Sequence, residues 1–171
     1  SMATSWLVYR LTGSELLLGI AGVAGQLPML VITPVAGVLV DRMDRRRILV
    51  ITQVAAMLQS AVLAVLVFTD LITVTQIIWL QVAQGVINSF DTPARQAFVG
   101  EMVGREHLTN AVALNSATFN LGRIVGPSIA GAMIAFISAG WVFLLNAVLF
   151  LVAALLLVRL RSDELRDPML D

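Results

Sequence analysis

Charged residues that could form a salt-bridge network are concentrated between Asp41 and Arg47, where seven residues hold two aspartates and four arginines. Asp41 and Arg45 are four residues apart, a spacing that lets the two side chains pair across one helical turn. Gly37 stands one turn before Asp41 and would permit close approach of another helix. A loop that only set the topology of the chain would need the arginines alone, so the aspartates favour a specific ion-pair network.

A second set of polar residues recurs at steps of three and four residues, the spacing of one helix face. Its members are Gln81, Gln84, Asn88, Asp91 and Arg95. Such side chains either form hydrogen bonds between helices, worth about 0.6–2 kcal/mol each, or line a water-filled cavity. A stripe this continuous suits a cavity wall, and both interpretations stay open at this point.

Arg123 is the third candidate, because it is the only charged residue in the apolar run 111–139. If that run spans a membrane, an arginine near its middle costs at least about 2.5–3.5 kcal/mol. Ser116, Asn120 and Pro127 share its helix face by their spacing. Arg123 either extends to the interface or bonds backbone carbonyls near Pro127, or it contacts an anionic or polar substrate or modulates a coupling proton.

The segments that carry these residues are long and apolar. The chain is 58% apolar and 13% charged, whereas a soluble domain usually has about 25% charged residues. Lipid offers no partner to an unpaired backbone group, so runs of about 20 apolar residues must span as helices. We predict an all-α membrane protein, a helical bundle over residues 1–160. Its spans are expected at about 15–40, 46–69, 74–95, 108–139 and 141–160, with residues 1–11 as the remnant of a truncated first helix.

The arginines predict the orientation of this bundle. If the spans alternate in direction, nine arginines fall on one side, namely Arg42, Arg45, Arg46, Arg47, Arg95, Arg105, Arg159, Arg161 and Arg166. Basic loops face the cytoplasm in membrane proteins, and amphipathic rings such as Trp79 and Trp141 prefer the interface. The two tryptophans open their spans on the opposite side, so the hairpin at 41–47 is expected in the cytoplasm.

Small residues in the run 108–139 suggest helix packing. Gly122, Gly126 and Ala130 are spaced four residues apart, which favours close contact with another helix. Pro127 removes one backbone hydrogen bond and should kink the helix. The segment could therefore act as a pivot, although packing alone explains the series equally well.

Two of these stretches resemble signatures of the major facilitator superfamily. Residues 37–46 resemble G-x-L-a-D-R-x-G-R-R, which lies between the second and third helices, and Gly37, Leu39, Asp41, Arg42, Arg45 and Arg46 match it. Residues 122–131 resemble G-x-x-x-G-P-x-x-x-G of the fifth helix in export-type members, with matches at Gly122, Gly126, Pro127 and Gly131. The wider pattern WLVYRLTGS, FDTPARQAFVGEMV and LNSATFNLGRIVGP is similar to the branch of the enterobactin exporter and macrolide efflux proteins.

Two residues depart from the patterns of that superfamily. Asp44 replaces the usual glycine of the hairpin and adds a carboxylate to its network. Gln81 stands where many proton-coupled antiporters have arginine, which argues against a proton-transfer role at that position.

The resemblance implies the N-terminal half of a twelve-helix transporter, with 161–171 as the start of a cytoplasmic linker to a missing six-helix C-terminal half. It implies a secondary active transporter that exports a small molecule, such as a siderophore or drug, across the bacterial cytoplasmic membrane. The mechanism would be proton-coupled alternating access around a midplane site. Residues expected along the pathway are Gln81, Gln84, Asn88, Asn120 and Arg123. Residues expected in the gate are Gly37, Asp41, Arg42, Arg45, Arg46 and Asp91, with a relay in which Arg45 or a neighbouring arginine pairs with both Asp41 and Asp91.

Other functions receive less support. The chain has no cysteine and one histidine, so neither thiol chemistry nor a histidine-rich metal cluster is indicated, and no cofactor is expected. The basic residues are a topology signal rather than a nucleic-acid surface. An enzyme would need an acid, base or metal cluster at midplane depth that the sequence does not contain. The main alternative is a non-transporting six-helix scaffold, which would have no need of the polar stripe.

Overall fold

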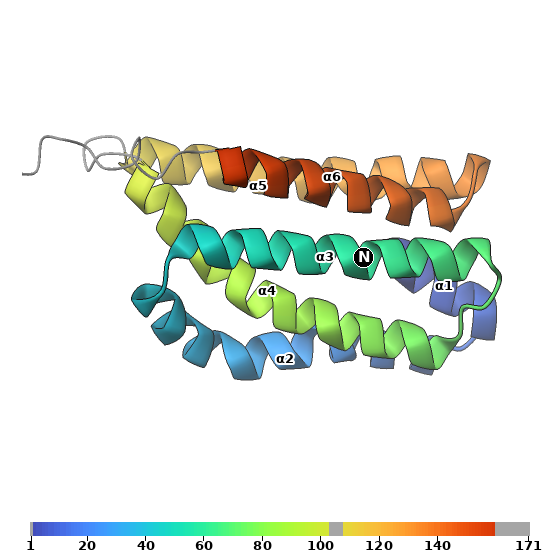
Figure 1. Cartoon of the computed structure of the whole chain (residues 1–171). Coiled ribbons are helices and arrows are strands. Elements are labelled where there is room, and N and C mark those ends of the chain that lie inside the picture. The colour runs from blue at the N-terminus through green and yellow to red at the C-terminus, as the bar shows by residue number, and fades with distance from the viewer. Residues whose placement is uncertain (1, 103–107, 160–171) are drawn as a thin grey trace, which may run out of the picture.

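The computed structural model describes residues 2–102 and 108–159, and every regular element within them is an α-helix (Figure 1). The helices are α1 (Met2–Thr12), α2 (Glu15–Arg42), α3 (Arg45–Phe68), α4 (Val74–Met102), α5 (Leu108–Phe136) and α6 (Ala139–Arg159). The linker predicted at 161–171, together with Arg105 and His107 of the α4–α5 connection, lies outside the described residues.

A few residues with strong local preferences make the turns. Gly13 has a φ of +62°, a left-handed conformation that glycine adopts without a steric penalty. Ser14 then caps α2, its side chain accepting a hydrogen bond from the Leu17 N–H at 3.4 Å. Asp70 has a φ of +54° in the turn after α3, and aspartate tolerates this region better than most residues. The resulting turns are short, and consecutive helices therefore run antiparallel.

α4 is longer than predicted, because it continues past residue 95 to Met102. Pro93 lies inside the helix and lacks the N–H of one helical hydrogen bond. Ala94 and Phe98 beyond it are nevertheless buried, in a cluster with Val40 and Ile48. This burial stabilises the last turns of α4 and brings the end of the helix to residues 41–47, the charged hairpin. α6 begins at Ala139, slightly earlier than predicted.

Four helices in the described part are long and apolar enough to cross a membrane: α2, α3, residues 113–136 of α5, and α6. α4 has 29 residues, which is sufficient length, but it is too polar to join this group. All five predicted full spans are therefore present as long helices, and four of them have the expected apolar composition.

The helices pack around two buried clusters (Figure 1). α2 packs mainly on α4, and α3 lies between α4 and α6. One cluster joins α1, α3, α4 and α6 through Val8, Leu63, Ile77 and Phe143. The other joins the opposite ends of α2, α3 and α4, with Leu157 of α6 packed against it. α5 lies beside α6 and touches the other helices less.

The closest helix crossing lies between α2 and α4 at Gly25 and Gly85. A Cβ placed on Gly85 would lie 2.3 Å from the carbonyl oxygen of Gly25, which no side chain can tolerate without a shift. Gly37, which the sequence suggested for a close helix approach, has no neighbouring helix within 4 Å of its Cβ position among the described residues, so that approach stays a prediction. At this end of α2 the buried residues are Ala36 and Val40, and Gly37 lies on a different face.

The small-residue face of α5 is largely uncovered. Gly122 and Gly126 have nothing within 4 Å of their Cβ positions, whereas Gly131 meets the Met2 side chain at 3.6 Å. Ala130, Met133 and Ile134, beyond Pro127, pack against the first buried cluster. The close packing predicted at Gly122 and Gly126 therefore has no partner helix among the described residues.

Candidate functional site

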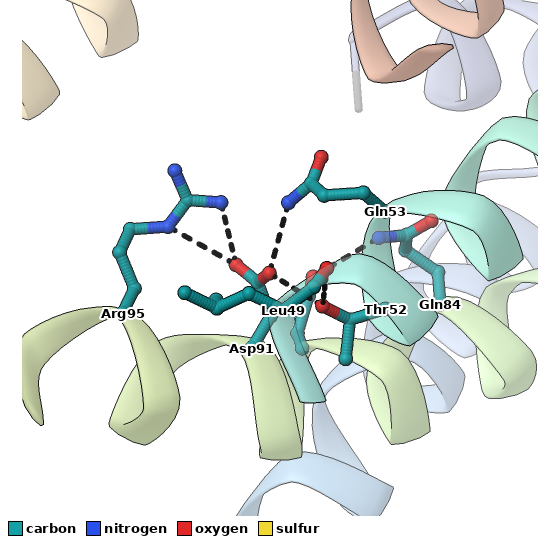
Figure 2. A network of polar contacts seen from close by, with 7 residues as sticks. Leu49, Thr52, Gln53, Gln84, Asp91 and Arg95 are labelled. Atoms are coloured by element: carbon teal, nitrogen blue, oxygen red, sulfur yellow. Dashed lines mark hydrogen bonds and ion pairs between the residues drawn. The ribbon is translucent and has the colours of Figure 1, made fainter. Parts of the chain in front are cut away.

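Asp91 lies at the centre of a polar cluster between α3 and α4 (Figure 2). Its Oδ1 accepts hydrogen bonds from Thr52 Oγ1 at 2.8 Å and from Gln53 Nε2 at 3.0 Å. Its Oδ2 accepts from Arg95 Nη2 at 2.8 Å and from Nε at 3.2 Å. The Asp91 side chain is only 16% exposed. The carboxylate of Asp91 therefore joins two α3 side chains to α4.

The rest of the α4 stripe is half-buried and is bonded partly to itself. Gln84 donates from Nε2 to Asn88 Oδ1 at 3.0 Å, along the helix rather than to a neighbour. Gln81 lies at the glycine crossing, near the Cβ position of Gly25. Hydrogen bonds between helices are present at the Asp91 end of the stripe, and the cavity wall stays a prediction. The Asp91 end bonds α3, and the bond between Gln84 and Asn88 stays on the surface of α4.

Sequence analysis missed the α3 members of this cluster. Thr52 and Gln53 are both buried, and Thr52 Oγ1 also lies 2.9 Å from the Leu49 carbonyl oxygen. The available signal was two adjacent polar residues in an apolar run, because such groups remain in a membrane helix only where they find partners.

Arg45 joins three helices at the charged hairpin. Its Nη2 lies 3.8 Å from Asp41 Oδ1, as the spacing predicted, and its Nη1 forms an ion pair with Glu101 at the end of α4. Its Nε is buried, and no described residue offers it a hydrogen bond. The predicted relay is therefore wrong for this conformation, because Arg45 pairs with Glu101 and Asp91 pairs with Arg95. The cause is the added length of α4, which carries Glu101 to the hairpin.

Asp44, the residue that departs from the superfamily pattern, is the N-cap of α3. Its Oδ1 accepts from the N–H groups of Arg46 at 3.0 Å and of Arg47 at 3.3 Å. A helix leaves its first N–H groups without internal partners, and an aspartate at this position satisfies them. Its Oδ2 also lies 3.3 Å from Arg47 Nε. Asp44 thus supplies a side-chain cap that the glycine of the superfamily pattern, having no side chain, could not supply.

Arg46 reaches from the start of α3 to the end of α6. Its Nε donates to the carbonyl oxygen of Leu157 at 2.7 Å, and its Nη2 donates to the carbonyl oxygen of Val158. Arg42, in the last turn of α2, is exposed. The four arginines of the hairpin therefore differ in their contacts.

The two α5 candidates stand apart from this network. Asn120 and Arg123 are exposed, and no hydrogen bond or ion pair of the described residues joins Arg123 to α4. The described part of the chain also contains no group of three or more side chains suited to hold a metal ion. The structure therefore brings together the candidates of α2, α3 and α4, and leaves those of α5 separate.

Comparisons with known proteins agree on the class of this chain. A profile of the family described as transmembrane secretion effector, of the major facilitator superfamily, matches residues 1–171. The staphyloferrin A transporter of Staphylococcus aureus is 31% identical over 165 residues, which cover 96% of this chain and 42% of that protein. The multidrug efflux pump Tap of Mycolicibacterium fortuitum is 38% identical over 139 residues, 78% of this chain and 34% of that protein.

Macrolide efflux protein A of Streptococcus pyogenes is 25% identical over 166 residues, 97% of this chain and 41% of that protein. This chain spans less than half the length of each of these three relatives. The comparison with solved structures gave no match.

The family match covers every residue of the chain and includes both stretches that resemble superfamily signatures. The long apolar helices agree with it, since they make the chain a multi-pass membrane protein. The chain therefore belongs to the transmembrane secretion effector family of the major facilitator superfamily.

Proposed function

We propose that this chain is the first half of a secondary active transporter that exports a small molecule, such as a siderophore or a drug. The observation that carries the proposal is the polar stripe of α4, which places half-buried glutamine, asparagine and aspartate side chains on one helix of an otherwise apolar bundle. Polar groups at membrane depth are costly and mark substrate or ion pathways. The relatives support export, because their names describe a siderophore transporter and efflux pumps.

In the proposed mechanism this bundle rocks against a second six-helix half, and the pathway opens alternately to each side of the membrane. Gln81, Gln84 and Asn88 of α4 would offer hydrogen bonds to the substrate. Asn120 and Arg123 of α5 would face it from the other side. A proton gradient would drive the cycle. Arg123, which the described residues leave without an acidic partner, suits a substrate or a proton-carrying group of negative charge.

The gate would consist of the ion pairs at the charged hairpin. Asp41, Arg45 and Glu101 join α2, α3 and α4 at one end of the bundle, and Asp91 ties α3 to α4 one step further inside. Partly exposed pairs of this kind are individually weak, about 0–1 kcal/mol each, so they can break and re-form during a cycle. Gly37, Arg42 and Arg46 belong to the same hairpin.

The described arginines Arg42, Arg45, Arg46, Arg47 and Arg159 lie at the same end of the bundle, where α2 and α6 finish and α3 begins (Figure 1). The excess of basic residues on the cytoplasmic side of membrane proteins supports this end as the cytoplasmic one, in the bacterial inner membrane.

The test is transport by the complete reading frame that contains this chain, in inside-out membrane vesicles with an imposed pH gradient. We expect uptake of at least one substrate from a panel of siderophores and drugs, lost when a protonophore removes the gradient. The double variant Gln84→Leu, Asn88→Leu should lose uptake while still inserting and folding. A folded protein that moves no member of the panel under any gradient would contradict the proposal and favour a scaffold.

A further inference from the structure

Arg46 occupies a position that its own helix does not favour. It lies in the first turn of α3, directly after Arg45, where the helix dipole presents its positive end. Its guanidinium instead donates to the carbonyls of Leu157 and Val158 in the last turn of α6, more than a hundred residues away. Those carbonyls lie in the last turn of α6 that the structure describes, and a cation is favoured near the carbonyl end of a helix. The charge of Arg46 is thus placed to suit α6 rather than α3.

A second contact fixes the same turn of α6. The Leu157 side chain packs against the buried cluster of Val40, Ile48, Leu49, Ala94 and Phe98, which lies beneath the charged hairpin. The last turn of α6 is therefore held by its side chain to α2, α3 and α4, and by its backbone to Arg46. Apolar contact alone would let α6 slide against the cluster. The two hydrogen bonds from the planar guanidinium of Arg46 fix the orientation of α6 relative to α3.

We propose that Arg46 transmits the state of the hairpin ion pairs to the last described turn of α6, which ends at Arg159. This inference rests on the proposed transport function. Arg45 forms the ion pairs with Asp41 and Glu101, and Arg46 is the next residue of the same helical turn. A shift of that turn when the ion pairs break must carry the end of α6 with it or break both Arg46 hydrogen bonds. The charged hairpin thus acts on four helices, α2, α3, α4 and α6.

The experiment measures whether the end of α6 follows the hairpin. Spin labels on Leu30→Cys and Leu156→Cys, two exposed positions on α2 and α6, report the distance by pulsed electron paramagnetic resonance in the complete transporter. This chain has no cysteine of its own, and any cysteine elsewhere in the complete transporter is first replaced by serine. We expect Asp41→Asn with Glu101→Gln to shift the distance distribution. Addition of Arg46→Ala should abolish that shift, and addition of Arg47→Ala should leave it.

Arg47 is the matched control, because it is the adjacent arginine, its side chain is 83% exposed, and it pairs with Asp44 of its own turn. Export should fall roughly fivefold or more in Arg46→Ala, the lower range of coupling between sites, and stay unchanged in Arg47→Ala. Arg46→Lys keeps the charge but not the fork, so it should restore only part of the export. If Arg46→Ala does not fold, Arg46→Gln serves in its place.

A shift that persists without Arg46, or one that Arg47→Ala abolishes equally, would overturn the inference. An unmutated protein that exports nothing would instead contradict the proposed transport function, since the distance measurement does not depend on a substrate.

Discussion

At the scale of single residues, the hairpin at 41–47 divides its charges among several helix ends. Asp41 pairs with Arg45 across the α2–α3 turn, Asp44 caps α3, and Arg46 binds the end of α6. The spacing of Asp41 and Arg45 was sufficient to predict their pairing, because both lie within a few residues of the same turn. The cap and the bond to α6 were not predicted, since the first needs the helix start and the second needs the position of α6.

The cap at Asp44 can be tested against the glycine that the superfamily pattern would place there. Asp44→Ala should lower the free energy of unfolding by about 1 kcal/mol, because two N–H groups of α3 lose their acceptor. Asp44→Gly should cost only a few tenths of a kcal/mol, since glycine is itself tolerated as an N-cap. Thermal unfolding in detergent measures both. Equal losses in the two variants would show that the side chain of Asp44 does not cap the helix.

Asp91 supports a second prediction at this scale. Asp91→Ala should destabilise the protein by about 1–3 kcal/mol, because the buried donors of Thr52 and Gln53 lose their acceptor. Arg95→Gln is the control, because its side chain is 48% exposed and water can replace it. Its effect should stay below about 1 kcal/mol. Chemical or thermal unfolding that ranks Arg95→Gln above Asp91→Ala would contradict this account of the cluster.

The site residues that sequence analysis missed share one cause. Asp91 was recognised from the period of its own helix, whereas Thr52 and Gln53 are 39 and 38 residues away along the chain. Glu101 lies beyond residue 95, where the sequence predicted that this span would end, whereas α4 continues to Met102. A pattern within one helix shows which face is polar, but the partner of that face depends on helix packing, which the period does not determine.

At the scale of the helices, apolar runs and turn residues predicted ranges close to the observed helices, with differences at the end of α4, the end of α5 and the start of α6. The contact that sets the distance between α2 and α4 was not foreseen. The sequence motifs pointed to Gly37 and to the α5 glycines as helix contacts. The α2 and α4 backbones instead meet at Gly25 and Gly85. Small residues mark many positions where helices could meet, and only the fold selects the one that is used.

This crossing gives a prediction with a matched control. Gly85→Ala should destabilise the protein by at least about 1–3 kcal/mol, because the new methyl group would meet the backbone of Gly25 and not a side chain that could move. Gly22 lies in α2, one turn before Gly25, and a Cβ at this position meets nothing within 4 Å. Gly22→Ala should therefore stabilise the protein by about 0.4–1 kcal/mol. If both variants shift the unfolding midpoint in the same direction from that of the unmutated protein, the close contact at Gly85 is contradicted.

At the scale of the whole molecule, α5 is the helix that this bundle covers least. Its exposed face carries Asn120, Gly122, Arg123 and Gly126 together, so the polar candidates and the small residues face the same open surroundings. The superfamily pattern predicted a functional fifth helix. It could not predict that the described helices would leave this face uncovered, because that depends on how α5 lies relative to α4 and α6.

Arg123 is best tested in the complete transporter, where that face has its natural surroundings. If Arg123 binds an anionic substrate, Arg123→Gln should lower its export about tenfold or more, since a hydrogen bond to a charged group contributes about 1.5–3 kcal/mol. Export of a neutral substrate should change little, and Arg123→Lys should retain part of the anion export. Vesicle uptake of an anionic and a neutral compound measures the difference. An equal loss for both compounds would indicate a structural role.

The polarity of α4 also bears on how the protein is made. Several of its polar groups are satisfied by α3, since Thr52 and Gln53 bind Asp91, and Gln59 donates to the Leu80 carbonyl at 3.2 Å. If α4 left the translocon alone, the Asp91 carboxylate would enter lipid without those donors. The free energy of membrane insertion is unfavourable for an aspartate in the middle of a helix. We therefore expect α3 and α4 to enter the bilayer together, as a helical hairpin joined by residues 69–73.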